Sequence, residues 1–420
     1  MKRGFFSQSE LSVRRNTESI IPRCGLCGLY KTCQAPRMEV TGEGRRKILI
    51  IGEAPGKTED EYVDPRTGRK GKQFIGESGQ LLRDTLKDNG IHPDRDCWWD
   101  NSLRCRPPGN KLPDNDKRLM EMLEACRPNL LKTIKELQPN VIILAGGTPC
   151  KSLIPVLWKP GIGKAGTWGS WRIPSQVVNA WVCPTFHPSY ILRNPGPTIE
   201  KKFRQDIAAA VRLKNRPWKE VPDYLSMVEP IYRPGQASKA IRKLVQDAKR
   251  MDVPIAFDYE TTCLKPEYHG AEIISCSMSN GQWTIAYPWT GSAVADTDEV
   301  LRQPIRKIAS NMKFEDRWTR KHLGHPVAGW YWDTMLAAHV LDNREEVTGV
   351  KFQSFVLLGV KAYDEHVEKY LKSFDSSHLN RIKELDLKDL LLYNGMDALV
   401  EWMVAAKQIR AMERMKNDTE

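Results

Sequence analysis

The sequence lacks any hydrophobic run that approaches the roughly 20 residues needed to cross a bilayer, which excludes membrane-spanning helices of ordinary length. Its opening residues, MKRGFFSQSELSVRR, are basic but contain neither a continuous apolar stretch nor a small-residue cleavage site, so we expect no signal peptide. Internal repeats and low-complexity tracts are also absent. What is present is a chain of 420 residues with a 40% hydrophobic fraction, which predicts about two or three globular domains. Without a signal peptide, we expect the protein to stay in the cytoplasm.

Positive charge is concentrated in the first half of the chain. Residues 1–230 hold 38 Lys and Arg against 25 Asp and Glu, whereas residues 231–420 hold 26 against 27. A basic surface favours nucleic acid because Lys and Arg neutralise phosphates, and a solvated basic face is the alternative at this stage.

The order of the local patterns predicts two α/β domains in tandem. In the first half, β-rich and helical patterns alternate, which implies a parallel sheet flanked by helices; the patterns lie at 47–52, 78–90, 126–137 and 140–147. Residues 214–234 contain four prolines and no sustained period, which is typical of a linker. We therefore expect a first domain over 1–213 and a second over 235–420.

Two carboxylates interrupt an apolar strand pattern in the second half. In PIAFDYETTCLKP (254–266), Asp258 and Glu260 stand two residues apart and so point to the same face of a strand. Buried carboxylates repel each other unless a divalent cation binds them, although surface strands often carry such pairs by chance. Farther along the chain, Asp316 falls in the helical pattern ASNMKFEDRW, and Tyr393 and Asp397 stand at i and i+4 in LLLYNGMDALVEWM.

Together, FDYET, NMKFED and YNGMD resemble the three motifs of the DnaQ-like 3′-to-5′ exonucleases, in the variant with tyrosine in the last motif. The segment WDTMLAAHVLDN (332–343) resembles the matching helix in the editing domain of bacterial DNA polymerase I. The resemblance implies an RNase H-like fold and phosphodiester hydrolysis with two Mg²⁺ or Mn²⁺ ions. It also implies that Asp258 bridges both ions, that Glu260 and Asp397 hold the ion that activates water, that Asp316 supports the second ion, and that Tyr393 orients the water.

Ten cysteines without a secretion signal argue against a disulfide framework and for thiolates that bind metal. The segment CGLCGLYKTC offers Cys24, Cys27 and Cys33, and a single C-x₂-C of this kind fits zinc, redox or plain core cysteines. Further partners must come from distant segments, where Cys105 and Cys126 lie in NSLRCRPPGN and LEACRPNL.

Residues 20–213 resemble the iron-sulfur uracil-DNA glycosylases of family 4. In this family four thiolates hold a [4Fe-4S] cluster at the positions of Cys24, Cys27, Cys105 and Cys126. Cys33 is then not a cluster ligand; in the alternative, it replaces a neighbouring cysteine as a ligand. The remaining five cysteines are expected to be small core residues.

The active-site motifs of the glycosylases also match, in IGEAPGKTED, GKQFIGESGQLL, WDNSLRCRPP and TFHPSYILR. By this resemblance Phe74 stacks on a flipped uracil and Asn101 reads its edge, while His187 donates to the oxygen that becomes negative. Glu53 and the backbone of Gly52 would face the sugar and the water. One departure is the long segment EYVDPRTGRK (61–70) beside the pocket, which either contacts DNA or occludes the site.

The order of the two parts resembles the beginning of certain bacteriophage family A DNA polymerases. Because the sequence ends 23 residues after Asp397, we expect an editing subunit that works with a separate family A-type DNA polymerase in a phage-like replication or repair system. The expected substrate is DNA. In the alternative, the first domain is catalytically silent and serves only to dock DNA or the polymerase.

Overall fold

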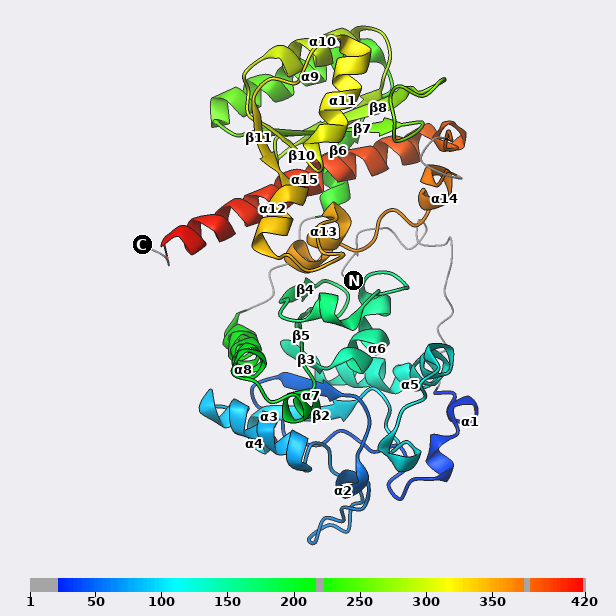
Figure 1. The fold of residues 1–420 in the computed structure, drawn as a ribbon, viewed down its shortest axis with the longest axis vertical. Coiled ribbons are helices and arrows are strands. Elements are labelled where there is room, and N and C mark those ends of the chain that lie inside the picture. Colours follow the sequence, from blue (N-terminus) through cyan, green and yellow to red (C-terminus); the bar gives the residue numbers. More distant parts are fainter. Residues whose placement is uncertain (1–21, 217–222, 374–377, 418–420) are drawn as a thin grey trace. The chain divides into compact units, whose positions relative to one another are not determined.

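The computed structural model describes residues 22–216, 223–373 and 378–417 (Figure 1). The chain divides into two compact units, with the main division between residues 220 and 221. Among the described residues, no helix is both long enough and apolar enough to span a membrane.

The first unit is built on a five-stranded sheet with the strand order β2-β1-β3-β5-β4. All neighbouring strands are parallel except β4 and β5, which are antiparallel. The two central strands read ILIIG and VIILA and are buried on both faces, as continuous aliphatic runs in a parallel sheet must be. The strands are β1 (Ile48–Gly52), β2 (Cys97–Asn101), β3 (Val141–Ala145), β4 (Ile173–Ser175) and β5 (Ala180–Thr185).

Helices cover both faces of this sheet, so the first unit has three layers (Figure 1). On one face α3 and α8 bury their apolar stripes against β1 and β3, and on the other α6 packs against the same strands and against α5. The helices are α1 (Cys24–Cys27), α2 (Lys57–Asp60), α3 (Glu77–Asp88), α4 (Pro93–Asp96), α5 (Asp116–Leu137), α6 (Gly147–Leu157), α7 (Pro188–Arg193) and α8 (Pro197–Arg212).

The second unit contains a six-stranded mixed sheet with the order β11-β10-β7-β8-β9-β6. The meander β7-β8-β9 is antiparallel, whereas β10 and β11 follow β7 in parallel and β6 runs parallel to β9. The strands are β6 (Val228–Pro230), β7 (Ile255–Thr261), β8 (Ile273–Ser279), β9 (Thr284–Pro288), β10 (Lys307–Ala309) and β11 (Trp330–Asp333).

Two long helices lie on opposite faces of this second sheet. Helix α9 begins with a proline at its first turn and buries an aliphatic stripe against β8 and β9. Helix α15 crosses the other face along β6 to β10, and it is the long red helix in Figure 1. The helices are α9 (Pro234–Met251), α10 (Ser292–Arg302), α11 (Met312–Leu323), α12 (Thr334–Leu341), α13 (Val350–Leu358), α14 (Glu368–Leu371) and α15 (Leu387–Asn417).

Part of the stretch 214–234 belongs to the second sheet. Residues 217–222 of it lie outside the described residues, but Val228–Pro230 forms β6 at the edge of the second sheet, and α9 already begins at Pro234. Proline is tolerated here because an edge strand leaves one side of its backbone unpaired. The domain boundaries at 213 and 235 stay a prediction.

Candidate functional site

Three carboxylates from two elements of the second unit meet at one point. Asp258 and Glu260 extend from the same face of β7, and Asp397 comes from α15, which packs directly on that face. One carboxylate oxygen from each lies within 4.8 Å of the other two. The close approach of α15 depends on Gly395, where a methyl group would lie 2.4 Å from Val228 Cγ1.

Without a bound cation, negative charge on these three acids is unfavourable. Burial, and then the charge of Asp397, raises the pKa of Asp258, and burial followed by the charge of Asp258 raises the pKa of Glu260. Hard divalent cations such as Mg²⁺ and Mn²⁺ prefer carboxylate oxygens and would remove this repulsion. The donor set therefore fits the expected ions.

Asn394 holds Asp258 in position and was missed by the sequence analysis. Its Nδ2 donates to Asp258 Oδ2 at 2.7 Å, and its Oδ1 accepts from Ser275 Oγ at 2.9 Å. Its backbone oxygen accepts a further hydrogen bond from Ser277. The sequence did offer a signal for Asn394, because it is a polar residue three positions before Asp397 on an apolar helix. Its partners become evident only from the packing of α15 on β8.

The structure does not bring Asp316 to the carboxylates, contrary to the expectation from the sequence. Asp316 Oδ2 accepts from Arg320 Nε at 2.6 Å, and Asp316 Oδ1 accepts from the backbone nitrogen of Val327 at 2.8 Å. Although burial works in the opposite direction, these contacts keep the pKa of Asp316 below its usual range. The side chain is thus engaged by Arg320 and by the backbone of Val327.

The neighbouring Glu315 faces the site instead. It is 2% exposed, and burial followed by the charge of Asp258 raises its pKa well above the usual range, with a further contribution from Glu260. A signal was present in the helical spacing, because Glu315 shares one face with Trp318 and Thr319, the other buried residues of α11.

A further buried acid, Glu401, lies one turn after Asp397 on α15. Its Oε1 accepts from the backbone nitrogen of Ser310 at 3.1 Å, and burial followed by the charge of Asp258 raises its pKa. Within the described residues, neither Glu315 Oε2 nor Glu401 Oε2 has a hydrogen-bond partner. Such unsatisfied buried oxygens are costly, which is consistent with a site that binds cations.

Tyr393 lies beside these acids, one helical turn before Asp397. It is 5% exposed, and its hydroxyl accepts from Lys351 Nζ at 2.5 Å. Burial raises the pKa of the neighbouring Asp397, against the lowering effects of the Lys351 charge and of the hydroxyls of Tyr363 and Tyr393.

In the first unit, the residues expected at a uracil pocket lie at the carboxyl ends of neighbouring parallel strands. Gly52 ends β1 and Asn101 ends β2, and the two are paired in register. A methyl group added at Gly52 would lie 2.4 Å from Asn101 Oδ1 and 2.5 Å from Phe74 Cζ. Only glycine therefore leaves room between Asn101 and Phe74, a space that we call the cradle. Asn101 is 3% exposed, and its Nδ2 has no hydrogen-bond partner among the described residues.

Phe74 adopts a left-handed backbone conformation with φ of 56°, which is uncommon for an aromatic residue. Arg83 Nε donates to Phe74 O at 2.7 Å, and a methyl group at Gly79 would lie 2.3 Å from Phe74 O. The ring also packs on Trp99 at 5.0 Å between centroids. Strain held in place this firmly is typical of functional positions.

Glu53 and His187 face each other across the same end of the sheet. Thr148 donates to Glu53 Oε2 at 2.6 Å. His187 is the N-cap of α7, and its Nδ1 accepts from the backbone nitrogen of Ser189 at 3.1 Å, so the ring proton lies on Nε2. Burial lowers the pKa of His187, against the opposing effect of Glu53, and favours the neutral donor form.

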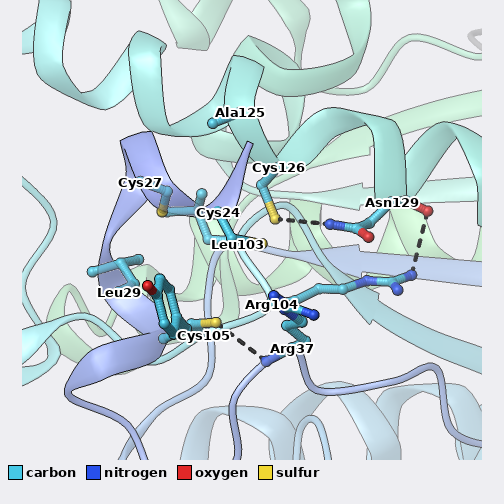
Figure 2. Close-up of a pocket in the computed structure, with 11 residues that line it drawn as sticks. Cys24, Cys27, Leu29, Arg37, Leu103, Arg104, Cys105, Ala125, Cys126 and Asn129 are labelled. Carbon is cyan, nitrogen blue, oxygen red and sulfur yellow. Dashed lines mark hydrogen bonds between the residues drawn. The ribbon is translucent and has the colours of Figure 1, made fainter. Parts of the chain in front are cut away.

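Four cysteines line one cavity in the first unit (Figure 2). Cys24 and Cys27 come from α1, Cys126 from α5, and Cys105 from the loop after β2. Burial raises the pKa of the Cys105 thiol to about 12 and that of Cys126 to about 11, so only a bound cation would make them thiolates at neutral pH. The backbone nitrogen of Arg37 donates to Cys105 Sγ at 3.2 Å, as iron-sulfur sites favour.

The other cysteines lie apart from this cavity lining. Cys33 packs against the same apolar cluster as Cys105, but it does not line the cavity. The remaining five are buried and serve as small core residues; they are Cys97, Cys150, Cys183, Cys263 and Cys276. The segment 61–70 forms a small hairpin closed by a bridge between Val63 and Lys70.

Comparison with known proteins supports both halves. The model of the uracil DNA glycosylase superfamily matches residues 40–211, and a 3′-5′ exonuclease model matches residues 232–407. The type-4 uracil-DNA glycosylase of Pyrobaculum aerophilum is 33% identical over 194 residues, which cover 45% of this chain and 88% of that protein.

Two further matches cover 74% and 44% of this chain. The DNA polymerase of Bacillus phage SP01 is 24% identical over 349 residues, covering 74% of this chain and 34% of the polymerase. The structure of Escherichia coli RNase D, an exoribonuclease involved in structured RNA processing, matches with 14% identity and a TM-score of 0.33, covering 44% of this chain and 45% of that chain. The expected families and the expected pair of α/β domains are confirmed. The chain therefore belongs to the uracil-DNA glycosylase superfamily, as a relative of the type-4 enzymes, and carries a 3′-5′ exonuclease domain after its glycosylase-like domain.

Proposed function

We propose that the second domain removes nucleotides from DNA 3′ ends at the site formed by Asp258, Glu260 and Asp397. The observation that carries this proposal is the convergence of the three carboxylates within 4.8 Å. Glu315 would complete the acidic set in place of Asp316, because Glu315 is the acid of α11 whose charge acts on the cluster.

The residues divide the work of hydrolysis between them. Asp258, Glu260, Asp397 and Glu315 would hold two Mg²⁺ or Mn²⁺ ions, which supply a nucleophilic hydroxide and stabilise charge on the phosphate. Asn394 keeps the Asp258 carboxylate oriented through its 2.7 Å hydrogen bond. Tyr393 would orient the attacking water through its hydroxyl.

Digestion of a 5′-labelled single-stranded oligonucleotide tests the exonuclease proposal. Asp258→Ala should end digestion while circular dichroism stays unchanged, and Asp223→Ala, at an exposed position outside the site, should digest like the original protein. Normal digestion by Asp258→Ala would refute the assignment.

For the first domain, the proposal is excision of uracil from DNA. The supporting observation is the cradle at Gly52, where the unpaired Asn101 Nδ2 is available to donate to a base carbonyl and Phe74 offers an aromatic face. The Nε2 proton of His187 would donate to the oxygen that becomes negative as the glycosidic bond breaks, and Glu53 would face the sugar and water.

A uracil-containing oligonucleotide separates excision from the alternative of a silent docking domain. If excision occurs, Asn101→Ala should abolish the abasic product and leave the exonuclease unaffected. Absence of product at high protein excess would instead favour docking of DNA or a polymerase.

The same proposal includes a [4Fe-4S] cluster held by Cys24, Cys27, Cys105 and Cys126, supported by the shared cavity that these thiols line. It also includes a family A-type DNA polymerase as the partner, supported by the similarity of 74% of this chain to a phage polymerase. Co-purification with a polymerase from its native replication system tests the partner, and an absorption band near 400 nm in anaerobically purified protein tests the cluster.

A further inference from the structure

The proposed exonuclease site contains a buried lysine that no step above uses. Lys351 lies on α13, and its Nζ donates to Tyr393 Oη at 2.5 Å. The same nitrogen is 3.7 Å from Asp397 Oδ2 and 3.9 Å from Asp364 Oδ2, and it lies 4.5 Å from the centre of the Tyr393 ring. Only 26% of the Lys351 side chain is exposed, and these contacts hold its ammonium group in one position.

The charge of Lys351 reaches all three carboxylates of the site. It lowers the pKa of Asp258, Glu260 and Asp397, in each case against the larger effect of burial. The Nζ of Lys351 lies within ion-pair distance of the carboxylates of Asp397 and Asp364. Lys351 is therefore the internal counter-ion of the acidic set.

The hydrogen bonds of Tyr393 define what its hydroxyl is able to do. A phenol hydroxyl has one proton to donate and oxygen lone pairs to accept with. Lys351 occupies one acceptor position of the Tyr393 oxygen at 2.5 Å, and Tyr363 is the tyrosine whose hydroxyl donates to Asp397 Oδ1. The remaining acceptor position is then the one that receives a proton of the attacking water, which turns the water's own lone pair toward phosphorus.

We propose that Lys351 is a positioning residue of the exonuclease reaction, which fixes the hydroxyl of Tyr393 as an acceptor for the attacking water and balances the carboxylates until divalent ions bind. Lys351 acts through Tyr393 and through its charge, and it does not itself bind DNA. This inference rests on the proposed exonuclease function.

The first test is a kinetic comparison of Lys351→Met with the original protein at saturating Mn²⁺. The value of kcat should fall about 10- to 100-fold because the water loses its fixed acceptor, whereas KM for the oligonucleotide should stay within about threefold. Lys388→Met, at an exposed position on α15, is the matched control and should behave like the original protein. A raised KM with unchanged kcat would overturn the proposal, since it would mean that Lys351 holds the DNA backbone.

The second test asks whether Lys351 acts through Tyr393. In a Tyr393→Phe background, Lys351→Met should lower kcat by less than about threefold, because the hydroxyl that it positions is already gone. Full multiplication of the two single effects would overturn the proposal.

The third test measures Mn²⁺ binding by calorimetry without any substrate. Removing the competing ammonium should tighten Mn²⁺ binding about tenfold in Lys351→Met, while Lys351→Arg should stay near the original affinity. A disrupted fold would weaken binding, so weaker or unchanged Mn²⁺ affinity would overturn the proposal. Asp258→Ala separates the two levels: if it digests DNA normally, the exonuclease assignment itself fails, whereas an inactive Asp258→Ala beside a fully active Lys351→Met refutes only the role of Lys351.

Discussion

Two adjacent acids of α11 make the sharpest test of the exonuclease site. Glu315→Gln and Asp316→Asn each remove one charge at nearly constant shape, one residue apart on the same helix. Glu315 is buried among the carboxylates, whereas Asp316 is engaged with Arg320, whose side chain is 58% exposed. We expect Glu315→Gln to lose the nuclease and Asp316→Asn to keep it.

The magnitudes follow from these surroundings. The ion pair of Asp316 with the exposed Arg320 is worth about 0.2–1 kcal/mol, and the asparagine oxygen still accepts from Val327, so the rate should change by less than about twofold. At Glu315, removing an ion ligand should raise the barrier by about 2.7–4 kcal/mol, which is roughly a 100- to 1000-fold loss of rate.

The stability of the metal-free protein should not follow the loss of rate. Glu315→Gln relieves repulsion by Asp258 but buries an amide, and each effect is of order 1–3 kcal/mol with opposite sign. The free energy of unfolding should therefore change by less than about 2 kcal/mol. Single-turnover digestion of a labelled oligonucleotide and urea unfolding measure the two quantities, and the reverse pattern, with an active Glu315→Gln and an inactive Asp316→Asn, would show that the reasoning is wrong.

Three further outcomes are expected from the first domain. Gly52→Ala should abolish uracil excision and spare the exonuclease, because the new methyl group would lie 2.4 Å from Asn101 Oδ1; retained excision in an oligonucleotide assay would contradict the cradle. Cys105→Ser should remove most of the absorbance near 400 nm while Cys33→Ser keeps it, and the opposite result would exchange their roles. Because burial lowers the pKa of His187 below its usual 6.5, the ring should stay neutral as the pH falls from 8 to 6.5 and excision should be constant over that range. NMR titration of His187 checks this, and protonation above pH 7 would count against a neutral donor.

The sequence predicted the fold where local pattern and strand topology agree. The strands β1 and β3 are buried on both faces of a parallel sheet, so they consist of continuous aliphatic runs that can be recognised from the sequence. Asp258 and Glu260 were predicted to share a face because side chains alternate along any strand, and they do so in β7. Strand β6 was missed because three residues that end in proline carry too little pattern to be recognised outside their sheet.

The rest of the exonuclease site depends on contacts between distant segments. Choosing Glu315 over Asp316 requires the rotation of α11 about its axis, since a helix turns about 100° per residue. Lys351 and Asn394 acquire their roles only when α13 and α15 pack together and α15 packs on β8, which no local pattern specifies.

Two buried polar groups of the candidate sites differ from Asn394 in how far their hydrogen bonds are satisfied. Asn394 has both ends of its amide engaged, by Asp258 and by Ser275, and so it positions its neighbours without needing anything further. In the part of the chain that the structure describes, Asn101 Nδ2 and Glu315 Oε2 lack any hydrogen-bond partner although both residues are almost fully buried. Because an unsatisfied buried donor or acceptor costs about 1–3 kcal/mol, its retention needs a compensating role. A free amide donor suits a base carbonyl and a free carboxylate oxygen suits a divalent cation, which supports the binding positions proposed for the two domains.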